Sequence, residues 1–281
     1  MVDWHFPRTE LAQEYLDEFE TGLANTIVVV SPRRTGKTEF LQRDLLPLAR
    51  DRGWISISVD FWADPDTPEL CLYRGFKEAF DNLPVHLKKS ANQWSASSVD
   101  FEGWGFQSNS EDTSARSLDE LNELWSVFKR LMQVHKQYVL LHLDEVQHLA
   151  TQKRFLNVTA SLRTFLDKNR THLRSIMTGS NQGDMQRLLH RSTAPFFQAI
   201  GIREYGLPEL SFVRHQLVCY ESLVGKQLIE REAIGFFESI NRNPGVFQAI
   251  VQDMVKLKVT NFNDAWSVWK FKYDIEKDIK R

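Results

Sequence analysis

Residue types that bind phosphate gather in one short segment, Ser31-Pro32-Arg33-Arg34-Thr35-Gly36-Lys37-Thr38. Gly36 lets the backbone curl so that successive N–H groups point at an anion. Lys37 places a cation on the β- and γ-phosphates, and the Thr38 hydroxyl is a hard oxygen ligand for Mg²⁺. Ser31 stands where this phosphate-loop pattern has its first glycine, and because serine is small we expect the turn to be kept. The segment predicts binding of ATP with Mg²⁺, against the alternative of a basic turn before a helix.

A second group of candidates is acidic. Asp144 and Glu145 follow directly on the apolar run 138–143, which is typical of a buried strand. In open α/β sheets the ligand crevice lies outside the carboxyl ends of the strands. We therefore expect Asp144 to hold a magnesium-bound water and Glu145 to orient or deprotonate the attacking water. The alternative is an ordinary pair of acids at the start of a helix.

A polar turn follows the next predicted strand. Residues 174–178 are followed by Gly179, Ser180 and Asn181. If this strand neighbours the one before the phosphate loop, Ser180 or Asn181 lies beside the γ-phosphate and helps to hold the attacking water. A turn with no catalytic part remains the alternative.

Hydrophobic periodicity indicates the elements that position these residues. Strands are expected at 26–30, 54–61, 138–143, 174–178 and 202–207. Helices are expected at 9–23, 39–50, 69–83, 117–135 and 157–168, with Pro47 kinking or ending the second. From residue 211 onward the strand pattern stops, and helices are expected at 213–223, 230–240 and 246–255.

Strands that alternate with helices predict a parallel sheet with helices on both faces. The expected fold is an α/β P-loop NTPase three-layer sandwich over residues 1–210, with a central parallel sheet. A small all-helical lid and a C-terminal tail are expected over 211–281. Residues at about 88–117 are polar and are predicted to form an insertion, with a short hairpin-like segment on a mobile loop.

Composition sets limits on function. The chain has 281 residues, and 35 basic against 37 acidic residues give a net charge of −2, without the basic excess of a dedicated nucleic-acid binder. The two cysteines, Cys71 and Cys219, lie in apolar stretches and are expected to be buried thiols. No signal peptide or run long enough to span a bilayer is recognised, so we expect a cytoplasmic protein with no membrane partner.

Three stretches together resemble the AAA+ superfamily of P-loop ATPases: Ser-Pro-Arg-Arg-Thr-Gly-Lys-Thr, Leu-Leu-His-Leu-Asp-Glu-Val-Gln and Met-Thr-Gly-Ser-Asn. The resemblance is nearest to the archaeal-type, STAND-related branch, in which a Pro-Arg-Arg-x-Gly-Lys-Thr loop is frequent. His5-Phe6-Pro7-Arg8 also resembles that branch's N-terminal motif near the adenine. The nucleotide-binding set is then Arg8, Ser31, Pro32, Arg33, Arg34, Thr35, Gly36, Lys37, Thr38 and Glu39.

The resemblance also implies roles for other residues. Lys37, Glu145 and Ser180 are implied to be catalytic, with Ser180 as the sensor-1 residue, and Thr38 and Asp144 to hold the metal. Members of the superfamily present an arginine finger to a neighbouring subunit, for which Arg187 and Arg191 are candidates. The segment 241–245 resembles the family's Gly-Gly-x-Pro lid turn with both glycines replaced, and Arg242 there is off register for a sensor-2 cation.

Three functions fit these residues. The first is an ATP-driven switch or remodelling ATPase that self-associates and acts on a protein or DNA partner. The second is a DNA-binding ATPase of the transposition or initiator-loader type, with candidate contacts at Arg33, Arg34, Lys88, Lys89, Trp94, Phe101, Trp104 and Phe106. The third is a phosphotransferase, which the paired acids disfavour because they indicate water as the acceptor.

Overall fold

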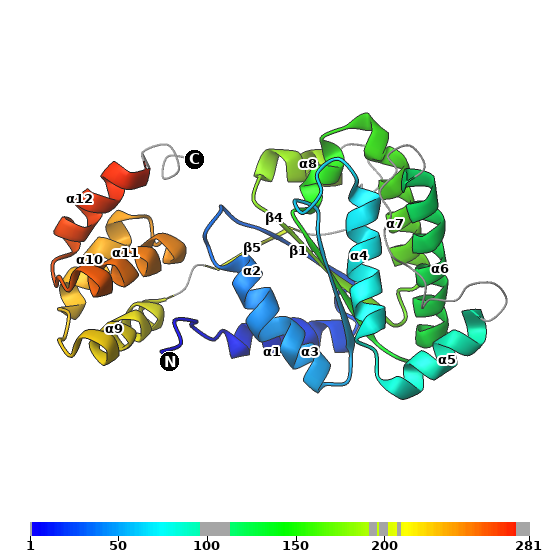
Figure 1. The fold of residues 1–281 in the computed structure, drawn as a ribbon, viewed down its shortest axis with the longest axis horizontal. Coiled ribbons are helices and arrows are strands. Elements are labelled where there is room, and N and C mark those ends of the chain that lie inside the picture. The colour runs from blue at the N-terminus through cyan, green and yellow to red at the C-terminus, as the bar shows by residue number, and fades with distance from the viewer. Residues whose placement is uncertain (1, 96–112, 191–195, 197–201, 207–208, 274–281) are drawn as a thin grey trace. The chain divides into compact units, whose positions relative to one another are not determined.

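The structure, a computed structural model, describes residues 2–95, 113–190, 196, 202–206 and 209–273 (Figure 1). The chain divides into two compact units. The sheet unit comprises Thr9–Val30 and Leu41–Glu204, and the helical unit comprises Met1–Arg8, Ser31–Phe40 and Tyr205–Arg281. The phosphate loop therefore follows a strand of the sheet unit along the chain but clusters by contact with the helical unit.

Among its described residues, the sheet unit has five strands in the order β2-β3-β4-β1-β5. All four pairings are parallel, as the alternation of strands and helices predicted. The strands are β1 (Thr26–Val30), β2 (Ile55–Asp60), β3 (Val139–Asp144), β4 (Leu173–Gly179) and β5 (Ile202–Glu204). Strands β3 and β4 are buried along their whole length, because helices cover both faces of a parallel sheet.

Helices of the sheet unit cover the strands (Figure 1). Helix α4 packs on β2 and against α6, and α7 contacts β4. The helices of this unit are α1 (Thr9–Glu20), α3 (Leu46–Asp51), α4 (Pro68–Asp81), α5 (Val85–Ser95), α6 (Thr113–Val134), α7 (Leu156–Lys168) and α8 (Gln182–His190). The short 3-10 helices η3 (Val146–Ala150) and η4 (Lys153–Phe155) follow β3.

The helix after the phosphate loop departs from the regular helix predicted at 39–50. It starts as α2 (Lys37–Phe40), widens into a π-helical segment η1 (Leu41–Leu45) and returns to α-helix in α3. Pro47 lies in the first turn of α3. A proline has no N–H to donate and its ring clashes with the carbonyl one turn before it, so the widened segment accommodates Pro47 without ending the helix.

Two further helices differ from the prediction. Residues 85–95 form α5, whereas the polar composition had indicated an insertion from about residue 88. Helix α6 begins at Thr113, four residues before the expected start at Ser117. The hairpin-like segment predicted within the insertion lies outside the described residues.

The helical unit contains α9 (Leu210–Val224), α10 (Glu230–Ser239), α11 (Pro244–Leu257) and α12 (Phe262–Tyr273). The first three were predicted, whereas α12 lies where only a tail was expected. Its Trp269 is 2% exposed and belongs to a core rich in phenylalanine, including Phe236, Phe237 and Phe247. Aromatic side chains of the predicted tail therefore complete the core of this unit.

The turn before α11, which resembles a Gly-Gly-x-Pro turn with both glycines replaced, has a backbone that suits glycine. Asn241 and Arg242 both have φ of 55°, in the left-handed region that favours glycine. The Asn243 side chain caps α11 by accepting a hydrogen bond from the Val246 N–H at 3.0 Å. The two side chains that replace glycine therefore sit in a conformation that costs about 1–2 kcal/mol for most residues.

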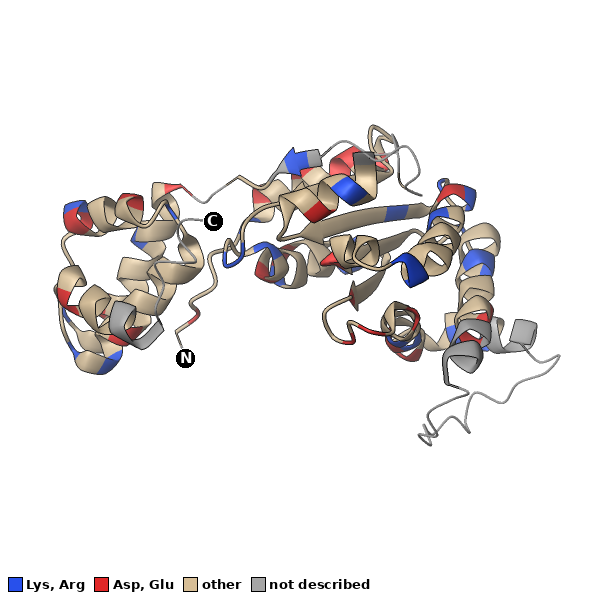
Figure 2. Ribbon diagram, turned by 90° about the horizontal axis from the view of Figure 1, so that it is seen from above, with Lys and Arg blue, Asp and Glu red and all other residues tan. Residues whose placement is uncertain are grey.

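Charges of both signs are interspersed along the helices of each unit (Figure 2). This arrangement agrees with the nearly balanced composition of the chain. None of the helices in the described part of the chain is long and apolar enough to cross a membrane.

Candidate functional site

The phosphate loop is braced by its own side chains. The Ser31 hydroxyl donates to Thr35 Oγ1 at 2.9 Å, and Thr35 Oγ1 donates to the Pro32 carbonyl at 2.9 Å. Ser31 and Thr35 are both buried. Gly36 has φ of 85°, a conformation that requires glycine at this point of the pattern. Serine at position 31 therefore keeps the turn, as its small size predicted, and adds a hydrogen bond across the loop.

Lys37 lies within the curl of this loop. Its ammonium group donates to the Ser31 carbonyl at 2.5 Å and to the Pro32 carbonyl at 2.9 Å. The residue is 6% exposed, whereas Thr38 is exposed. Carbonyl oxygens compensate the buried charge, and the same ammonium can exchange them for phosphate oxygens without leaving the loop. The side chain of Lys37 is therefore buried in the loop, whereas that of the adjacent Thr38 is exposed to solvent.

Residues near the N-terminus contact Tyr205, Gly206 and the helix that follows the loop. Arg8 donates to the Gly206 carbonyl at 2.8 Å, and its guanidinium lies 4.7 Å from the ring centroid of Tyr205. His5 Nδ1 lies 3.4 Å from a carboxylate oxygen of Glu39. The structure therefore places Arg8 and Glu39, both in the expected nucleotide-binding set, within the same unit as the loop.

The loop also contacts the turn that starts α11. The Gly245 N–H donates to the Arg34 carbonyl at 2.9 Å, and a Cβ on Gly245 would lie only 2.7 Å from that oxygen. Arg34 has φ of 63°, and its guanidinium lies 6.0 Å from the ring centroid of Trp269. The phosphate loop and the helical lid are therefore joined through the backbone, a contact that the sequence gave no signal for.

The acidic candidates lie at the carboxyl ends of neighbouring strands in the sheet unit. Asp144 ends β3 and is 8% exposed. Its Oδ1 accepts hydrogen bonds from the Thr178 hydroxyl and, at 3.1 Å, from the Glu145 N–H. Register pairs Thr178 of β4 with Val29 of β1, and the phosphate loop begins two residues after Val29. This edge of the sheet therefore carries Asp144, Glu145 and the strand end from which the loop continues.

Glu145 and Ser180 are brought together. The Ser180 hydroxyl donates to Glu145 Oε2 at 2.8 Å, and the Ser180 N–H reaches the same oxygen at 3.4 Å. Gln147 Nε2 donates to that oxygen as well. The Asn181 side chain instead caps the start of α8, where its Oδ1 accepts a hydrogen bond from the Asp184 N–H at 3.0 Å. Of the two alternatives at this turn, Ser180 is the one that contacts Glu145.

A buried histidine extends the network under Asp144. His142 Nε2 lies 3.4 Å from Thr178 Oγ1, and His142 Nδ1 lies 3.0 Å from the Ser58 hydroxyl. Burial lowers the pKa of His142 from 6.5 to about 4, so the ring is neutral. Because Thr178 gives its proton to Asp144, the tautomer that satisfies the network carries hydrogen on Nε2 and accepts from Ser58 at Nδ1. Three donations then run in one direction, towards the Asp144 carboxylate.

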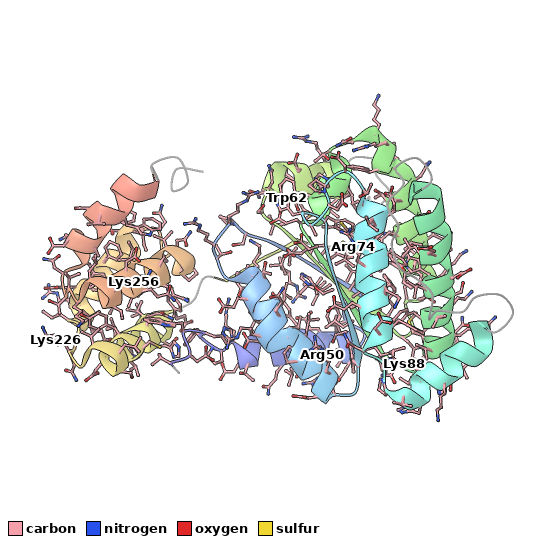
Figure 3. The ribbon with its side chains drawn as sticks, in the orientation of Figure 1. Arg50, Trp62, Arg74, Lys88, Lys226 and Lys256 are labelled. Carbon is pink, nitrogen blue, oxygen red and sulfur yellow. The ribbon has the colours of Figure 1, made fainter. Side chains whose placement is uncertain are left out.

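Two features near this edge were missed by the sequence reasoning. Asp60 ends β2 in register with Asp144, and burial raises its pKa, with a further contribution from the charges of Asp144 and Glu145. Trp62, on the segment after β2, is 48% exposed, and its ring centroid lies 5.2 Å from that of His148 (Figure 3). The available signals were an acid near the end of the strand predicted at 54–61 and an aromatic residue just after it.

One of the two candidate arginine fingers lies in the described part of the chain. Arg187 lies on α8 and forms an ion pair with Asp184 at 2.9 Å. Arg191 lies outside the described residues, as do Phe101, Trp104 and Phe106 of the predicted insertion.

Each of the two units has one residue with the kind of oxygen donor that Mg²⁺ prefers. Thr38 and Asp144 offer a hydroxyl and a carboxylate, the hard oxygen ligands that this ion prefers. Within the described ranges, no group of three or more His, Cys, Asp or Glu side chains could enclose a metal ion. Mg²⁺ in nucleotide sites keeps several waters and takes one or two protein ligands beside the phosphates, so a protein cage is not needed.

No protein-family model matches the sequence, and comparison with curated protein sequences finds no match. Solved structures do match. The Walker-type ATPase of Pyrococcus abyssi superposes with a TM-score of 0.59 at 18% identity, over 94% of this chain and 71% of that chain. AMPPCP-bound DnaA of Aquifex aeolicus gives 0.51 at 18% identity, over 96% of this chain and 68% of that chain.

The ORC1 protein of Aeropyrum pernix, solved in complex with DNA, gives a TM-score of 0.53 at 12% identity, over 96% of this chain and 67% of that chain. At these identities the likeness is one of fold. It confirms the predicted class, a P-loop ATPase α/β fold followed by a helical region.

Proposed function

We propose that this chain binds ATP with Mg²⁺ and hydrolyses it to ADP and phosphate. The observation that carries the proposal is the grip on Glu145, whose Oε2 accepts the Ser180 hydroxyl at 2.8 Å while its N–H bonds to Asp144 Oδ1 at 3.1 Å. A carboxylate held beside a second acid at the end of a buried strand is suited to accept a proton from water. The phosphate loop supports the same function, since Lys37 and Thr38 follow a curl with a left-handed Gly36.

Each residue has a defined task in this reaction. Lys37 and the backbone N–H groups of residues 33–38 bind the phosphates, and Arg8 and Glu39 complete the nucleotide site. Glu145 accepts a proton from water as the water oxygen bonds to the γ-phosphorus, while the bond from that phosphorus to the bridging oxygen breaks and ADP leaves with the electron pair. Thr38 and Asp144 would hold Mg²⁺, which would neutralise charge on the phosphates when bound.

The test is phosphate release by the purified protein with Lys37→Ala and Glu145→Gln as matched variants. We expect Lys37→Ala to lose nucleotide binding, because the phosphates lose their cation. Glu145→Gln is expected to bind ATP as the wild type does and to release phosphate at least 100-fold more slowly. Wild-type turnover in Glu145→Gln contradicts the assignment, and a phosphorylated small molecule in place of free phosphate identifies a phosphotransferase.

We further propose that hydrolysis drives a switch or remodelling activity on a macromolecular partner in a self-associated form. The archaeal-type, STAND-related branch of AAA+ ATPases is the family we propose, on the motif resemblance and on the likeness to the Walker-type ATPase of Pyrococcus abyssi. Arg187 and Arg191 are the proposed fingers. Turnover per chain is expected to rise with protein concentration and to fall in Arg187→Ala. Arg170→Ala, at an exposed arginine, is the control. Turnover that does not depend on protein concentration contradicts self-association.

A second candidate function is a DNA-binding ATPase of the initiator-loader type. It is favoured by the likeness to ORC1, solved in complex with DNA, and to DnaA. The candidate contacts within described helices include Lys88 and Lys89 of α5, of which Lys88 is labelled in Figure 3. Phosphate release with and without double-stranded DNA distinguishes the two candidates. DNA binding that needs ATP, weakens with salt and is lost in Lys88→Glu/Lys89→Glu supports the second.

A further inference from the structure

Gln147 is a buried polar side chain two residues beyond Glu145. It lies in η3, is 6% exposed, and its Nε2 donates to Glu145 Oε2. Its Oε1 has no hydrogen-bond partner among the described residues. A buried carbonyl oxygen without a partner costs about 1–3 kcal/mol. An apolar residue of the same length avoids that cost, so stability alone does not account for glutamine at this position.

The orientation of the Gln147 amide follows from its neighbours. With the amide reversed, Oε1 would face the carboxylate oxygen of Glu145, and two acceptors would meet. Gly179 leaves the space for Oε1, because a Cβ at that position would overlap both Oε1 and the terminal methyl of Met185. The amide is therefore confined between Glu145 on one side and the backbone of Gly179 on the other.

All the donors around Glu145 converge on one oxygen. The Gln147 amide, the Ser180 hydroxyl and the Ser180 N–H all donate to Oε2. No side chain or backbone group in the described ranges hydrogen-bonds to Oε1 of Glu145. Glu145 also has φ of 53°, a left-handed conformation that costs of order 1 kcal/mol for a residue with a side chain. Two unfavourable features, the strained backbone and the unpartnered Gln147 oxygen, therefore coincide at one carboxylate.

We propose that Gln147 is a positioning residue for Glu145. The inference rests on the proposed hydrolysis, in which Glu145 accepts a proton from water. Gln147 and Ser180 fix Oε2 from two directions, so the carboxylate does not rotate, and Oε1 is the oxygen that receives the proton. A shift of 1 Å in a catalytic group can slow a reaction by about 100-fold. A base held in one orientation is therefore more effective than one that rotates.

The test variant is Gln147→Met, which keeps the length of the side chain and removes the amide. We expect turnover to fall roughly 10- to 100-fold with unchanged ATP affinity, because Glu145 still interacts with water but in the wrong orientation. The midpoint of thermal unfolding is expected to stay the same or to rise, since the variant removes a buried oxygen without a partner. Gln152→Met, an exposed glutamine in the same segment, is the matched control and should behave as the wild type.

Ser180→Ala provides a second measurement that does not depend on the folding of the first variant. It removes another donor to Oε2, so turnover should fall with unchanged ATP affinity. The double variant should lose less than the product of the two single losses, because both residues act through one oxygen.

Several outcomes overturn the inference. Wild-type turnover in Gln147→Met or in Ser180→Ala contradicts it, and faster turnover in Gln147→Met shows instead that the amide restrains Glu145. A fall in turnover that parallels a fall in the unfolding midpoint indicates a structural role only. If the wild type itself releases no phosphate, the proposed hydrolysis fails, and this inference fails with it.

Discussion

The hydroxyl of Thr178 on β4 donates its proton to Oδ1 of Asp144 on β3, so the two strands hold the acid between them. His142 approaches the same hydroxyl oxygen at 3.4 Å. Thr178 therefore links the neutral histidine to the carboxylate. The direction of the Asp144 side chain is set both by the neighbouring strand, through Thr178, and by the Glu145 N–H just after β3.

Replacing Thr178 with valine keeps the shape and removes the hydroxyl. Both His142 Nε2 and Asp144 Oδ1 then lose a partner in a buried position, and the free energy of unfolding should fall by about 1–3 kcal/mol. Urea denaturation measures this change. Thr164→Val is the control, because its hydroxyl bonds to the Ala160 carbonyl on an exposed helix face. Equal losses in the two variants would show that the buried network does not contribute.

The contact between the phosphate loop and the lid predicts opposite effects for two glycine-to-alanine changes. In Gly245→Ala the new Cβ meets the Arg34 carbonyl at 2.7 Å, so the loop or α11 must shift. We expect a loss of about 1–3 kcal/mol and weaker ATP binding. Gly235 lies inside α10 with nothing within 4 Å of a new Cβ, and Gly235→Ala should gain up to about 1 kcal/mol. Thermal unfolding and nucleotide titration of the two variants test these expectations. Unchanged ATP affinity in Gly245→Ala would show that the contact between the loop and the lid does not affect nucleotide binding.

The left-handed turn before α11 can be tested at Asn241. Alanine lacks the side-chain amide that makes this region tolerable for asparagine, so Asn241→Ala should lose about 1 kcal/mol. Asn241→Gly removes the steric conflict and should match the wild type or exceed its stability. Chemical denaturation of the three proteins gives the order. Alanine as stable as glycine would mean that residue 241 does not keep φ of 55° in solution.

Cys71 predicts a loss of stability in alkaline solution. Burial raises the pKa of its thiol from 9.0 to about 11. Between these values the unfolded chain releases a proton that the folded protein keeps, so stability is full below pH 9.0 and falls as the pH rises through this window. Urea unfolding below and within the window should show a larger drop for the wild type than for Cys71→Ala. Equal drops in stability in the two proteins would assign the effect to another group. One such group is Tyr73, because burial raises its pKa to about 12.

Sequence reasoning predicted best where a single pattern decided the structure. The run 26–30 is a continuous stretch of β-branched residues, which is typical of a strand buried on both faces, and β1 spans those residues. Placing Glu145 and Ser180 at the ends of parallel strands was enough to expect them at one edge. Their hydrogen bond at 2.8 Å confirms that they lie together, while their catalytic roles remain predictions.

Other features depend on contacts that the sequence does not encode locally. Trp269 belongs to a buried core, but the stretch after the predicted lid is short, and only a tail was expected there. The π-helical segment arises because Pro47 must be accommodated, and the pattern predicted a kink without its form. Gln147 reads as an ordinary residue after the acid pair, and only the fold shows that its amide meets Glu145.

Serine at position 31 has a consequence for ligand binding. A loop with glycine at this position can adopt many backbone conformations and loses conformational entropy when it binds a ligand. Here the Ser31 and Thr35 side chains are already tied to one another. The loop therefore loses less conformational entropy when it binds an anion, because it is already ordered in the free protein.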